Sequence, residues 1–333
     1  MSLDVFYMRR CIQLAKNGRM NASPNPMVGA VIVADGRIIG EGYHVRCGEG
    51  HAEVNAFASV KREDESLLKA ATIYVSLEPC SHYGKTPPCA DLIIRKGVKR
   101  VVVGCEDPFA EVQGRGIQKI KDAGIEVVVG VCKEECEDLN KVFFTFHRQK
   151  RPFITLKWAE SKDGFIAKTD LEGMPHATLI STEQSRMYCH KLRAEHQAIL
   201  VGRNTLETDN PSLTTRYWNG KNPVRIVLTH SNPDKHLNIF NDEAPTFVMS
   251  GTISDVLREL YVKGIQSVLV EGGRSVLQQF IDQRVWDEAF IEKGDMLISK
   301  GIKAPMIPAR TDMRQSTIIF FHRRIVKITH FTL

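Results

Sequence analysis

The sequence predicts an α/β protein of two domains, and three observations support this. Its 333 residues are enough for about two domains of roughly 150 residues each. Short runs rich in β-branched residues alternate with helical segments, a pattern typical of sheets covered by helices. The basic segment RQKRP at 148–152 separates two such regions. We therefore expect a domain at 1–147, a linker at 148–152 and a second domain at 153–333.

The first region begins with a helix and a hairpin. The helix is expected from Asp4 to Asn17, with a polar residue at its start and a glycine after its end. Strands at 30–33 and 37–44 flank Asp35-Gly36, a dipeptide typical of tight hairpins. The remaining expected elements are a helix from 51, a strand at 71–77, a helix at 89–97, a strand at 100–105, a helix at 116–124, a strand at 126–130 and a helix at 133–146.

The second region opens with the run PFITLKW and also alternates. Its other expected strands lie at 198–202, 224–229, 246–250 and 267–273. Beyond Asp295 the pattern is weak, and the sequence assigns no element there.

Composition disfavours several classes of protein. Hydrophobic residues make up 43% and charged residues 25%, a balance typical of soluble domains. No stretch approaches the roughly 18 apolar residues that cross a bilayer, and Asp4 and Arg9-Arg10 interrupt any signal-peptide core. We therefore expect a cytoplasmic protein. The net charge of +6 is spread over both halves, whereas nucleic-acid-binding domains usually concentrate it on one face.

Three short segments carry the strongest chemical signal: His51-Ala52-Glu53, Pro79-Cys80 and Cys89. One imidazole and two thiols make three zinc ligands, and zinc with three protein ligands keeps its fourth position for water. Zinc lowers the pKa of that water to about 7, which makes hydroxide available at neutral pH. The carboxylate of Glu53 is suited to carry a proton from water to a leaving amine. The sequence therefore predicts a hydrolytic zinc site.

Other interpretations of these residues stay open. A fourth protein ligand would make the site a closed structural centre, and the candidates are His82, His44 and Cys47. A disulfide between Cys80 and Cys89 is disfavoured in a reducing compartment. Residues two apart do not share a helix face. The convergence of His51 and Glu53 therefore needs a turn that spacing alone does not establish.

The strings around these residues resemble one family. SPNPMVGAVIV, GEGYH, HAEVNAF, SLEPCSHYGKTPPCADLII and RVVVGCEDPF, spread over residues 1–147, resemble the deaminase half of the bifunctional riboflavin-biosynthesis family RibD/RibG. The resemblance implies a cytidine-deaminase-like sheet covered by helices. It implies that Glu53 carries protons and that the zinc ligands are His51, Cys80 and Cys89. It also implies substrate contacts at Asn25, His44 and Lys85.

The general signature of nucleobase zinc deaminases is H-x-E with P-C-x-x-C. This chain departs from it, because eight residues rather than two separate Cys80 from Cys89. The longer string E-P-C-S-H-x-G-x-T-P-P-C is characteristic of the riboflavin family.

The second half has no G-x-G-x-x-G between a strand and a helix, so a Rossmann fingerprint is absent. The strings LKWAESKDGFIA, KLRAEHQAILVGRNTLETDNPSLTTR and VLVEGGRSVLQQF instead resemble the reductase half of the same family. The resemblance implies a dihydrofolate-reductase-like α/β domain. It implies NADPH contacts at Ala159, Thr205, Asp209, Gly272 and Gly273. It implies substrate contacts at Arg193, Leu213, Arg216 and Glu271.

Physical chemistry supports part of this assignment. Glu271-Gly272-Gly273 is expected where a strand ends and a helix begins, and glycines there let backbone N–H groups approach a dinucleotide phosphate. The guanidinium groups of Arg193 and Arg216 suit a sugar phosphate. A plain turn and surface ion pairs are the alternatives.

Two departures from the family pattern concern the reductase half. Ala177 and Leu179 replace a Ser and a Trp that precede the pair matched by Ile180-Ser181. The region 287–300 also lacks the family's Pro-containing strand. A deaminase with an impaired reductase is therefore one alternative.

The resemblance implies two consecutive steps of riboflavin biosynthesis. The first removes the 2-amino group of 2,5-diamino-6-ribosylamino-4(3H)-pyrimidinone 5′-phosphate by hydrolysis. The second reduces the ribosyl group of 5-amino-6-(5-phosphoribosylamino)uracil with NADPH. We expect a small-molecule substrate, no nucleic acid, no membrane and a homo-oligomer. The rival hypotheses are a nucleic-acid-editing deaminase and a structural zinc module joined to a cofactor-binding domain.

Overall fold

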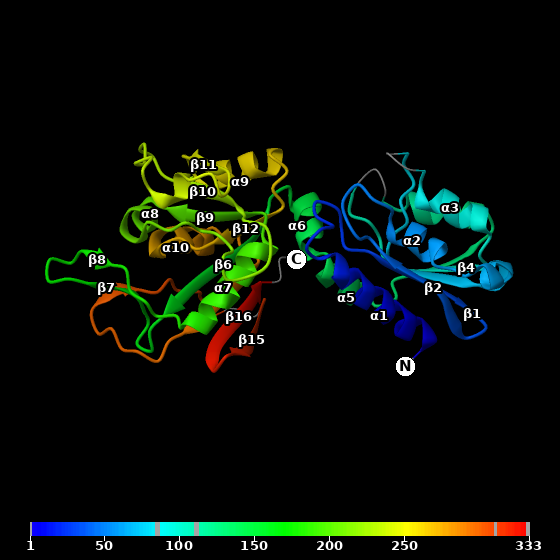
Figure 1. Ribbon diagram of the computed structural model, residues 1–333, viewed down its shortest axis with the longest axis horizontal. Helices are drawn as coiled ribbons and strands as arrows, with labels where there is room; N and C mark the ends of the chain where they lie inside the picture. The colour runs from blue at the N-terminus through cyan, green and yellow to red at the C-terminus, as the bar shows by residue number, and fades with distance from the viewer. Residues whose placement is uncertain (1, 84–86, 110–112, 310–311, 331–333) are drawn as a thin grey trace. The chain divides into compact units, whose positions relative to one another are not determined.

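The computed structural model describes residues 2–83, 87–109, 113–309 and 312–330. The chain divides into two compact units, 1–149 and 150–333. The two units share no sheet, and each has its own hydrophobic cores (Figure 1). Within the described ranges, no helix combines the length and the apolar character that a membrane span requires.

The first unit is built on a five-stranded sheet in the order β2-β1-β3-β4-β5. β1 runs antiparallel to both neighbours, whereas β3, β4 and β5 run parallel to one another. The carboxyl ends of β3 and β4 therefore lie at the same edge. The strands are β1 Gly29–Ala34, β2 Arg37–Tyr43, β3 Thr72–Leu77, β4 Arg100–Cys105 and β5 Glu126–Val129.

Helices cover both faces of this sheet (Figure 1). One core contains Phe57, Ile93 and Ile117 from α2, α3 and α4. The other contains Met8 and Cys136 from α1 and α5. The helices are α1 Leu3–Ala15, α2 Ala52–Ala58, α3 Cys89–Lys96, α4 Arg115–Asp122, α5 Lys133–Leu139 and α6 Lys141–Gln149, with short 3-10 helices at Lys16–Gly18 and Arg62–Ala70.

The hairpin between β1 and β2 has the turn that its sequence predicts. Asp35 and Gly36 both have positive φ, at 50° and 73°. A two-residue turn with both central φ angles positive matches the twist of the strands that it joins. The two strands pair down to Ala34 opposite Arg37.

The single helix expected at 133–146 is wrong, because α5 and α6 are separate helices that meet at Asn140. Asn140 leaves helical geometry, with φ −113° and ψ 23°. Its side-chain amide accepts a hydrogen bond from the Met27 N–H and donates one to the Met27 carbonyl, both at 2.8 Å. The break therefore anchors the segment that carries Asn25.

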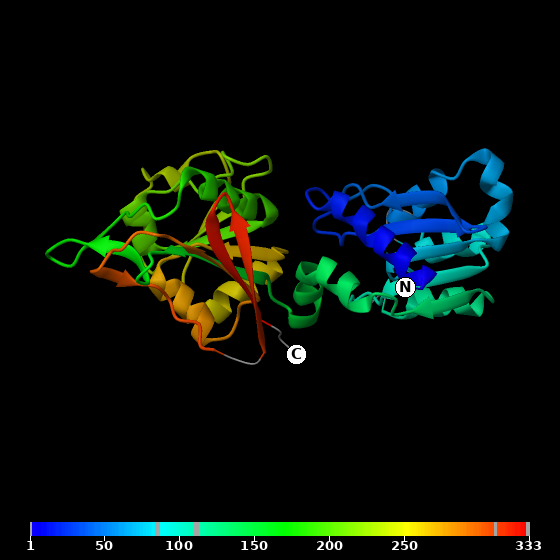
Figure 2. The same ribbon diagram turned by 90° about the horizontal axis from the view of Figure 1, so that it is seen from below.

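The second unit contains an eight-stranded sheet in the order β11-β10-β9-β12-β6-β13-β16-β15. The first six of these strands run parallel, and β16 and β15 are antiparallel (Figure 2). The strands are β6 Phe153–Glu160, β9 Ala198–Gly202, β10 Val224–Leu228, β11 Thr246–Met249, β12 Ser267–Val270, β13 Glu288–Lys293, β15 Met313–Phe320 and β16 Arg323–His330. A small sheet is formed by β14 Gly301–Lys303, β7 Phe165–Thr169 and β8 Pro175–His176.

The two faces of the large sheet are packed by different helices. Leu257 of α9 and Phe280 of α10 belong to the core on one face. Leu192 of α7 and Leu206 of α8 belong to the core on the other. The helices are α7 Glu183–Glu195, α8 Arg203–Asp209, α9 Ile253–Val262 and α10 Arg274–Asp282, with a short 3-10 helix at Asn238–Phe240.

The tail contains more structure than the sequence indicated. The region 287–300 lacks the family's proline, yet it forms the buried strand β13 between β6 and β16. Beyond Asp295, where the pattern is weak, the described residues form three further strands, β14, β15 and β16. β15 lies at the sheet edge with mostly exposed side chains, so it needs no regular apolar alternation.

Candidate functional site

Three side chains converge at the start of two helices in the first unit. His51 is the residue immediately before α2, Cys80 follows the end of β3, and Cys89 is the first residue of α3. The Nδ1 atom of His51 lies 3.5 Å from the Cys80 Sγ and 3.3 Å from the Cys89 Sγ. All three ligand atoms lie within 4.8 Å of one another.

These distances fit a zinc ion. With bonds of about 2.0–2.1 Å to nitrogen and about 2.3 Å to sulfur, tetrahedral geometry separates N and S ligand atoms by about 3.6 Å. Within the described part of the chain, only these three residues form a group with metal-binding distances. None of the other candidate ligands, His82, His44 and Cys47, joins the group.

The thiols and the imidazole influence one another's protonation. A hydrogen bond from the Cys89 thiol and the neighbouring His51 lower the pKa of Cys80 to about 4. The Cys80 sulfur in turn raises the pKa of His51. The Cys89 backbone N–H at the start of α3 also donates to the Cys80 sulfur at 3.3 Å. A thiolate suited to metal binding is therefore stabilised at Cys80.

Glu53 lies in the first turn of α2 and is only 3% exposed. Burial raises its pKa to about 7, against the opposing effect of the nearby His51. The interaction with Glu53 contributes to a raised pKa of Cys89, so the two side chains are neighbours. His51 stands before the helix in extended geometry, with ψ 168°. The rule for helix faces therefore does not separate His51 from Glu53.

Two of the predicted substrate residues lie beside this cluster. The Asn25 Nδ2 and the His44 Nε2 are 3.1 Å apart, and the His44 ring meets the His51 ring edge-on with centroids 5.5 Å apart. Burial lowers the pKa of His44. Its Nδ1 faces the Gly50 carbonyl at 3.2 Å, so the neutral ring donates from Nδ1 and accepts at Nε2. Lys85 lies outside the described residues.

Two buried carboxylates near the cluster were missed by sequence reasoning. Glu78 follows β3 and precedes the Pro79-Cys80 pair. Asp107 follows β4, which is the strand next to β3 in the sheet. Burial, together with Glu78 and Cys80, raises the pKa of Asp107 to about 6, although its hydrogen bond from the Phe109 N–H opposes this. Their positions in the sequence could have identified them, because each follows a predicted strand and the carboxyl ends of adjacent parallel strands meet at one edge of a sheet.

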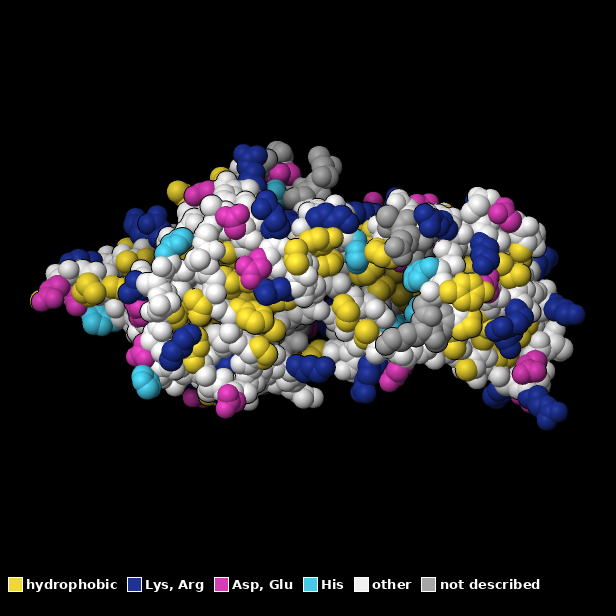
Figure 3. Space-filling view, turned by 90° about the horizontal axis from the view of Figure 1, so that it is seen from above, with side chains coloured by type: hydrophobic (Ala, Val, Ile, Leu, Met, Phe, Trp, Pro, Cys, Tyr) yellow, Lys and Arg dark blue, Asp and Glu magenta, His cyan; other side chains and the backbone are white. Residues whose placement is uncertain are grey.

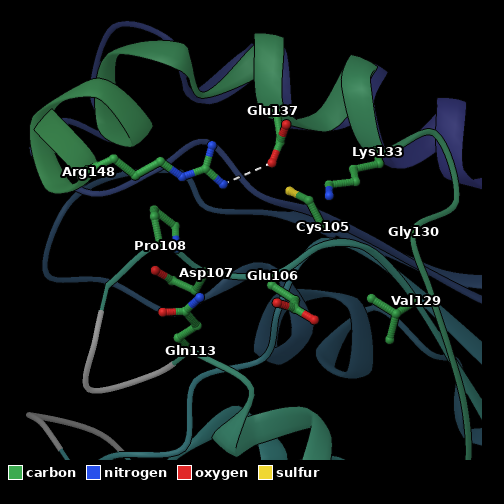
Figure 4. Close-up of a pocket in the computed structure, with 10 residues that line it drawn as sticks. All are labelled: Cys105, Glu106, Asp107, Pro108, Gln113, Val129, Gly130, Lys133, Glu137 and Arg148. Atoms are coloured by element: carbon green, nitrogen blue, oxygen red, sulfur yellow. Dashed lines mark hydrogen bonds and ion pairs between the residues drawn. The ribbon is translucent and has the colours of Figure 1, made fainter. Parts of the chain in front are cut away.

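A pocket of about 270 Å³ is lined in part by Asp107 (Figure 4). Glu106, Glu137 and Lys133 line it, and Arg148 pairs with Glu137 at 3.0 Å. Its volume is below the roughly 300–1,000 Å³ of most ligand sites. Its lining comes from the ends of β4 and β5, the residues that follow β4, and the helices α5 and α6, whereas the zinc-type ligands lie at the starts of α2 and α3 and after β3.

In the second unit, two predicted substrate residues bind each other. Arg193 forms a bidentate ion pair with Glu271 at 2.8 and 2.9 Å, and both side chains are 12% exposed. Arg193 also donates to the Thr214 carbonyl at 3.1 Å. Lys157 and Cys189 complete this buried cluster, and no motif in the sequence marks either as a site residue. The alternative in which Arg193 forms a surface ion pair is wrong, because its ion pair with Glu271 is buried.

The other predicted substrate residues lie in the segment after α8. Leu213 is buried and has a positive φ of 54°. Arg216 is exposed, lies over the Tyr217 ring and has its Nη1 3.4 Å from the Thr214 hydroxyl. Arg216 therefore has a guanidinium accessible to a ligand, whereas Arg193 is occupied.

Of the residues predicted to contact NADPH, Thr205 and Gly273 lie close together. A Cβ on Gly273 would lie 3.2 Å from the Thr205 hydroxyl, so α8 and the start of α10 are in contact. Gly273 caps α10 without a side-chain hydrogen bond. Gly272 lies between β12 and Gly273. The remaining predicted NADPH contacts are Ala159 in β6 and Asp209 at the end of α8. Burial raises the pKa of Asp209.

Lys and Arg side chains are scattered over the face shown in Figure 3 and form no continuous stripe there. The basic groove that a nucleic-acid-editing enzyme needs is therefore not apparent on that face.

Both units match models of known families. Residues 1–105 match the cytidine and deoxycytidylate deaminase zinc-binding region. Residues 152–298 match the RibD C-terminal domain.

Individual relatives cover most of the chain. The riboflavin biosynthesis protein RibD of Aquifex aeolicus is 44% identical over 276 residues, which is 81% of this chain and 74% of that protein. RibD of Bacillus amyloliquefaciens is 40% identical over 334 residues, covering 92% of this chain and 88% of that protein.

Solved structures agree over both units. A diaminohydroxyphosphoribosylaminopyrimidine deaminase/5-amino-6-(5-phosphoribosylamino)uracil reductase from Thermotoga maritima is 36% identical, with a TM-score of 0.88 over 98% of this chain and 99% of that one. RibD of Acinetobacter baumannii is 28% identical, with a TM-score of 0.85 over 99% of each chain.

Proposed function

The chain belongs to the RibD family of riboflavin biosynthesis proteins, and we propose that it acts on the two pyrimidine ribosyl phosphates named for the Thermotoga maritima enzyme. It is a bifunctional enzyme with a zinc-dependent deaminase unit and an NADPH-dependent reductase unit. In the proposed order, 2,5-diamino-6-ribosylamino-4(3H)-pyrimidinone 5′-phosphate first loses its 2-amino group. The ribosyl group of 5-amino-6-(5-phosphoribosylamino)uracil is then reduced.

One observation carries the deaminase assignment: three ligand atoms gather beside a buried carboxylate, with no fourth ligand among the described residues. His51, Cys80 and Cys89 would hold the ion. A zinc ion in such a site makes hydroxide available from water near neutral pH. This supports hydrolysis over the structural zinc module, which needs four ligands.

Glu53 is the proposed proton carrier. Its carboxyl group is buried beside the cluster, with a pKa raised by burial to about 7. A group with such a pKa takes up and releases a proton at neutral pH, as general acid–base catalysis requires. Glu53 thus accepts the proton of the attacking water and delivers it to the departing amine.

Asn25 and His44 are proposed to orient the pyrimidine. Their hydrogen bond and the contact of His44 with His51 hold both beside the metal ligands. The neutral His44 ring offers directed hydrogen bonding rather than charge. Lys85, on the family match, is proposed to pair with the substrate phosphate.

The second unit is proposed to bind the deaminated product around Glu271. The predicted phosphate contact is Arg216, whose guanidinium is exposed, while Arg193 holds Glu271 in place. The start of α10 at Gly272-Gly273 would receive a phosphate of NADPH, because its first N–H groups have no side-chain cap. Family membership argues against an impaired reductase. The roles of Ala159, Thr205, Asp209 and Leu213 remain family-based proposals.

The experiment that tests the deaminase is Glu53→Gln. The variant should keep stoichiometric zinc and lose at least about 100-fold in the rate of ammonia release, since general acid–base groups contribute about 10²–10⁴-fold. NADPH oxidation with the deaminated pyrimidine supplied directly serves as the control and should be unchanged. Ammonia release at the wild-type rate would exclude Glu53 as the proton carrier.

A further inference from the structure

Glu78 is a buried carboxylate that no step above uses. It stands between the end of β3 and the ligand Cys80, and it is 4% exposed. Its two oxygens accept hydrogen bonds from four backbone N–H groups at 3.0–3.3 Å, those of Asp107, Gly114, Gly116 and Ile117. Such a set of bonds fixes a carboxylate more firmly than a single contact does.

Three of these four donors belong to the start of α4. That helix begins after Gly114, which is in the left-handed conformation and provides no side-chain cap. The first N–H groups of a helix need outside acceptors, and negative charge there is favoured by the helix dipole. Glu78, distant in sequence, supplies both.

The start of α4 also packs closely against the backbone of Pro79, next to Cys80. A Cβ built on Gly116 would lie 1.9 Å from the Pro79 carbonyl oxygen, so only glycine permits this approach. On its other side, the Cys80 carbonyl accepts a hydrogen bond from the Ala90 N–H in α3 at 3.1 Å. The ligand Cys80 is thus held between the first turns of two helices.

The fourth donor connects Glu78 to the next strand. The Asp107 N–H bonds to Glu78 at 3.2 Å, and the Glu78 N–H bonds to the Cys105 carbonyl at 2.9 Å. One residue therefore joins the end of β3, the end of β4 and the start of α4.

We propose that Glu78 is a positioning residue of the deaminase, which keeps the Cys80 sulfur in place for the metal by fastening the end of β3 to the start of α4. In this role it acts through Cys80, because its two oxygens are taken up by backbone N–H groups. The inference rests on the proposed zinc-dependent deamination.

Glu78→Gln is the direct test. The amide keeps the size of the side chain. Its NH₂ group, however, is a hydrogen-bond donor and cannot accept hydrogen bonds from the backbone N–H groups that face it. Residues that orient metal ligands typically contribute about 10–100-fold to metal affinity or activity. We expect kcat for ammonia release to fall by about 10–100-fold. We also expect a chelator to remove the zinc at a higher rate. In the cobalt(II)-substituted protein, the thiolate absorption band should shift.

Gly116→Ala tests the same contact from the helix side. Its methyl group meets the Pro79 carbonyl without changing Glu78 or any metal ligand, so it should reproduce the zinc release and the cobalt(II) shift. The matched control is Asp163→Asn in the second unit. That carboxylate also accepts backbone N–H bonds, from Ile298 and Ser299, and its loss should leave ammonia release unchanged.

Two results would overturn the proposal. One is wild-type kcat and zinc retention in Glu78→Gln, and the other is an unshifted cobalt(II) spectrum in both variants despite lower activity. If Glu78→Gln does not fold, the Gly116→Ala spectrum decides. A wild-type chain that binds zinc but releases no ammonia would instead refute the proposed function.

Discussion

The buried pair of Arg193 and Glu271 shows how the surroundings of a residue set its charge. Burial by itself raises the pKa of Glu271, yet the Arg193 guanidinium, assisted by Lys157 and Cys189, lowers it to about 2. The carboxylate therefore stays ionised inside the unit, where an unpaired charge would be strongly destabilising.

This pair predicts a pH-dependent stability of the second unit. The folded pKa of Glu271 lies below its ordinary value of 4.5. Its stabilising contribution is therefore complete above that value and is lost as the pH falls from about 4.5 to about 2. Thermal unfolding of the second unit, followed from about pH 5 to about pH 2, should show this loss.

The control for this prediction is Glu271→Gln. That variant leaves Arg193 buried without its anion, so it should unfold at lower temperature near neutral pH and depend less on pH in the acidic range. Parallel pH curves for variant and wild type would contradict the assignment.

Among the elements, the break between α5 and α6 matters most for the deaminase. Asn140 gives up helical geometry, and its amide binds both backbone groups of Met27. Met27 lies two residues after Asn25, so a helix end on one face of the sheet supports the segment that carries this proposed substrate contact.

Asn140→Ala should destabilise the first unit by about 1–3 kcal/mol, because it leaves the Met27 N–H and carbonyl without partners. The KM for the aminopyrimidine should rise as Asn25 loses its support. Denaturant unfolding and steady-state ammonia release measure the two effects. Lys121→Ala, an exposed substitution in α4, is the control and should change neither quantity.

The two activities belong to units with separate hydrophobic cores. The zinc-type ligands lie in residues 1–149, and the predicted NADPH residues lie in 150–333. The residues predicted for the two reactions therefore lie in different units.

Metal removal should separate the two reactions. A strong chelator should abolish ammonia release, while NADPH oxidation continues when the deaminated pyrimidine is supplied. Added zinc should restore ammonia release. Loss of both reactions on chelation would show that the reductase also depends on the metal.

The α/β class, most strands and the residues of the zinc-type cluster can be predicted from the amino-acid sequence alone. Local signals suffice for these features, because a strand such as β4 and a turn such as Asp35-Gly36 depend on neighbours in the chain. The H-x-E and P-C segments likewise identify ligand types without any knowledge of their positions.

How distant residues combine becomes visible only once the chain is folded. The fold places His51 in extended geometry before α2, which brings Glu53 to the cluster, and it breaks a continuous helical pattern at Asn140 to bind Met27. The predicted ligand-binding residues Arg193 and Glu271 form a buried ion pair with each other, and Glu78 accepts hydrogen bonds from the start of α4. These contacts join segments dozens of residues apart, and spacing along the chain does not encode the direction in which a buried polar group points.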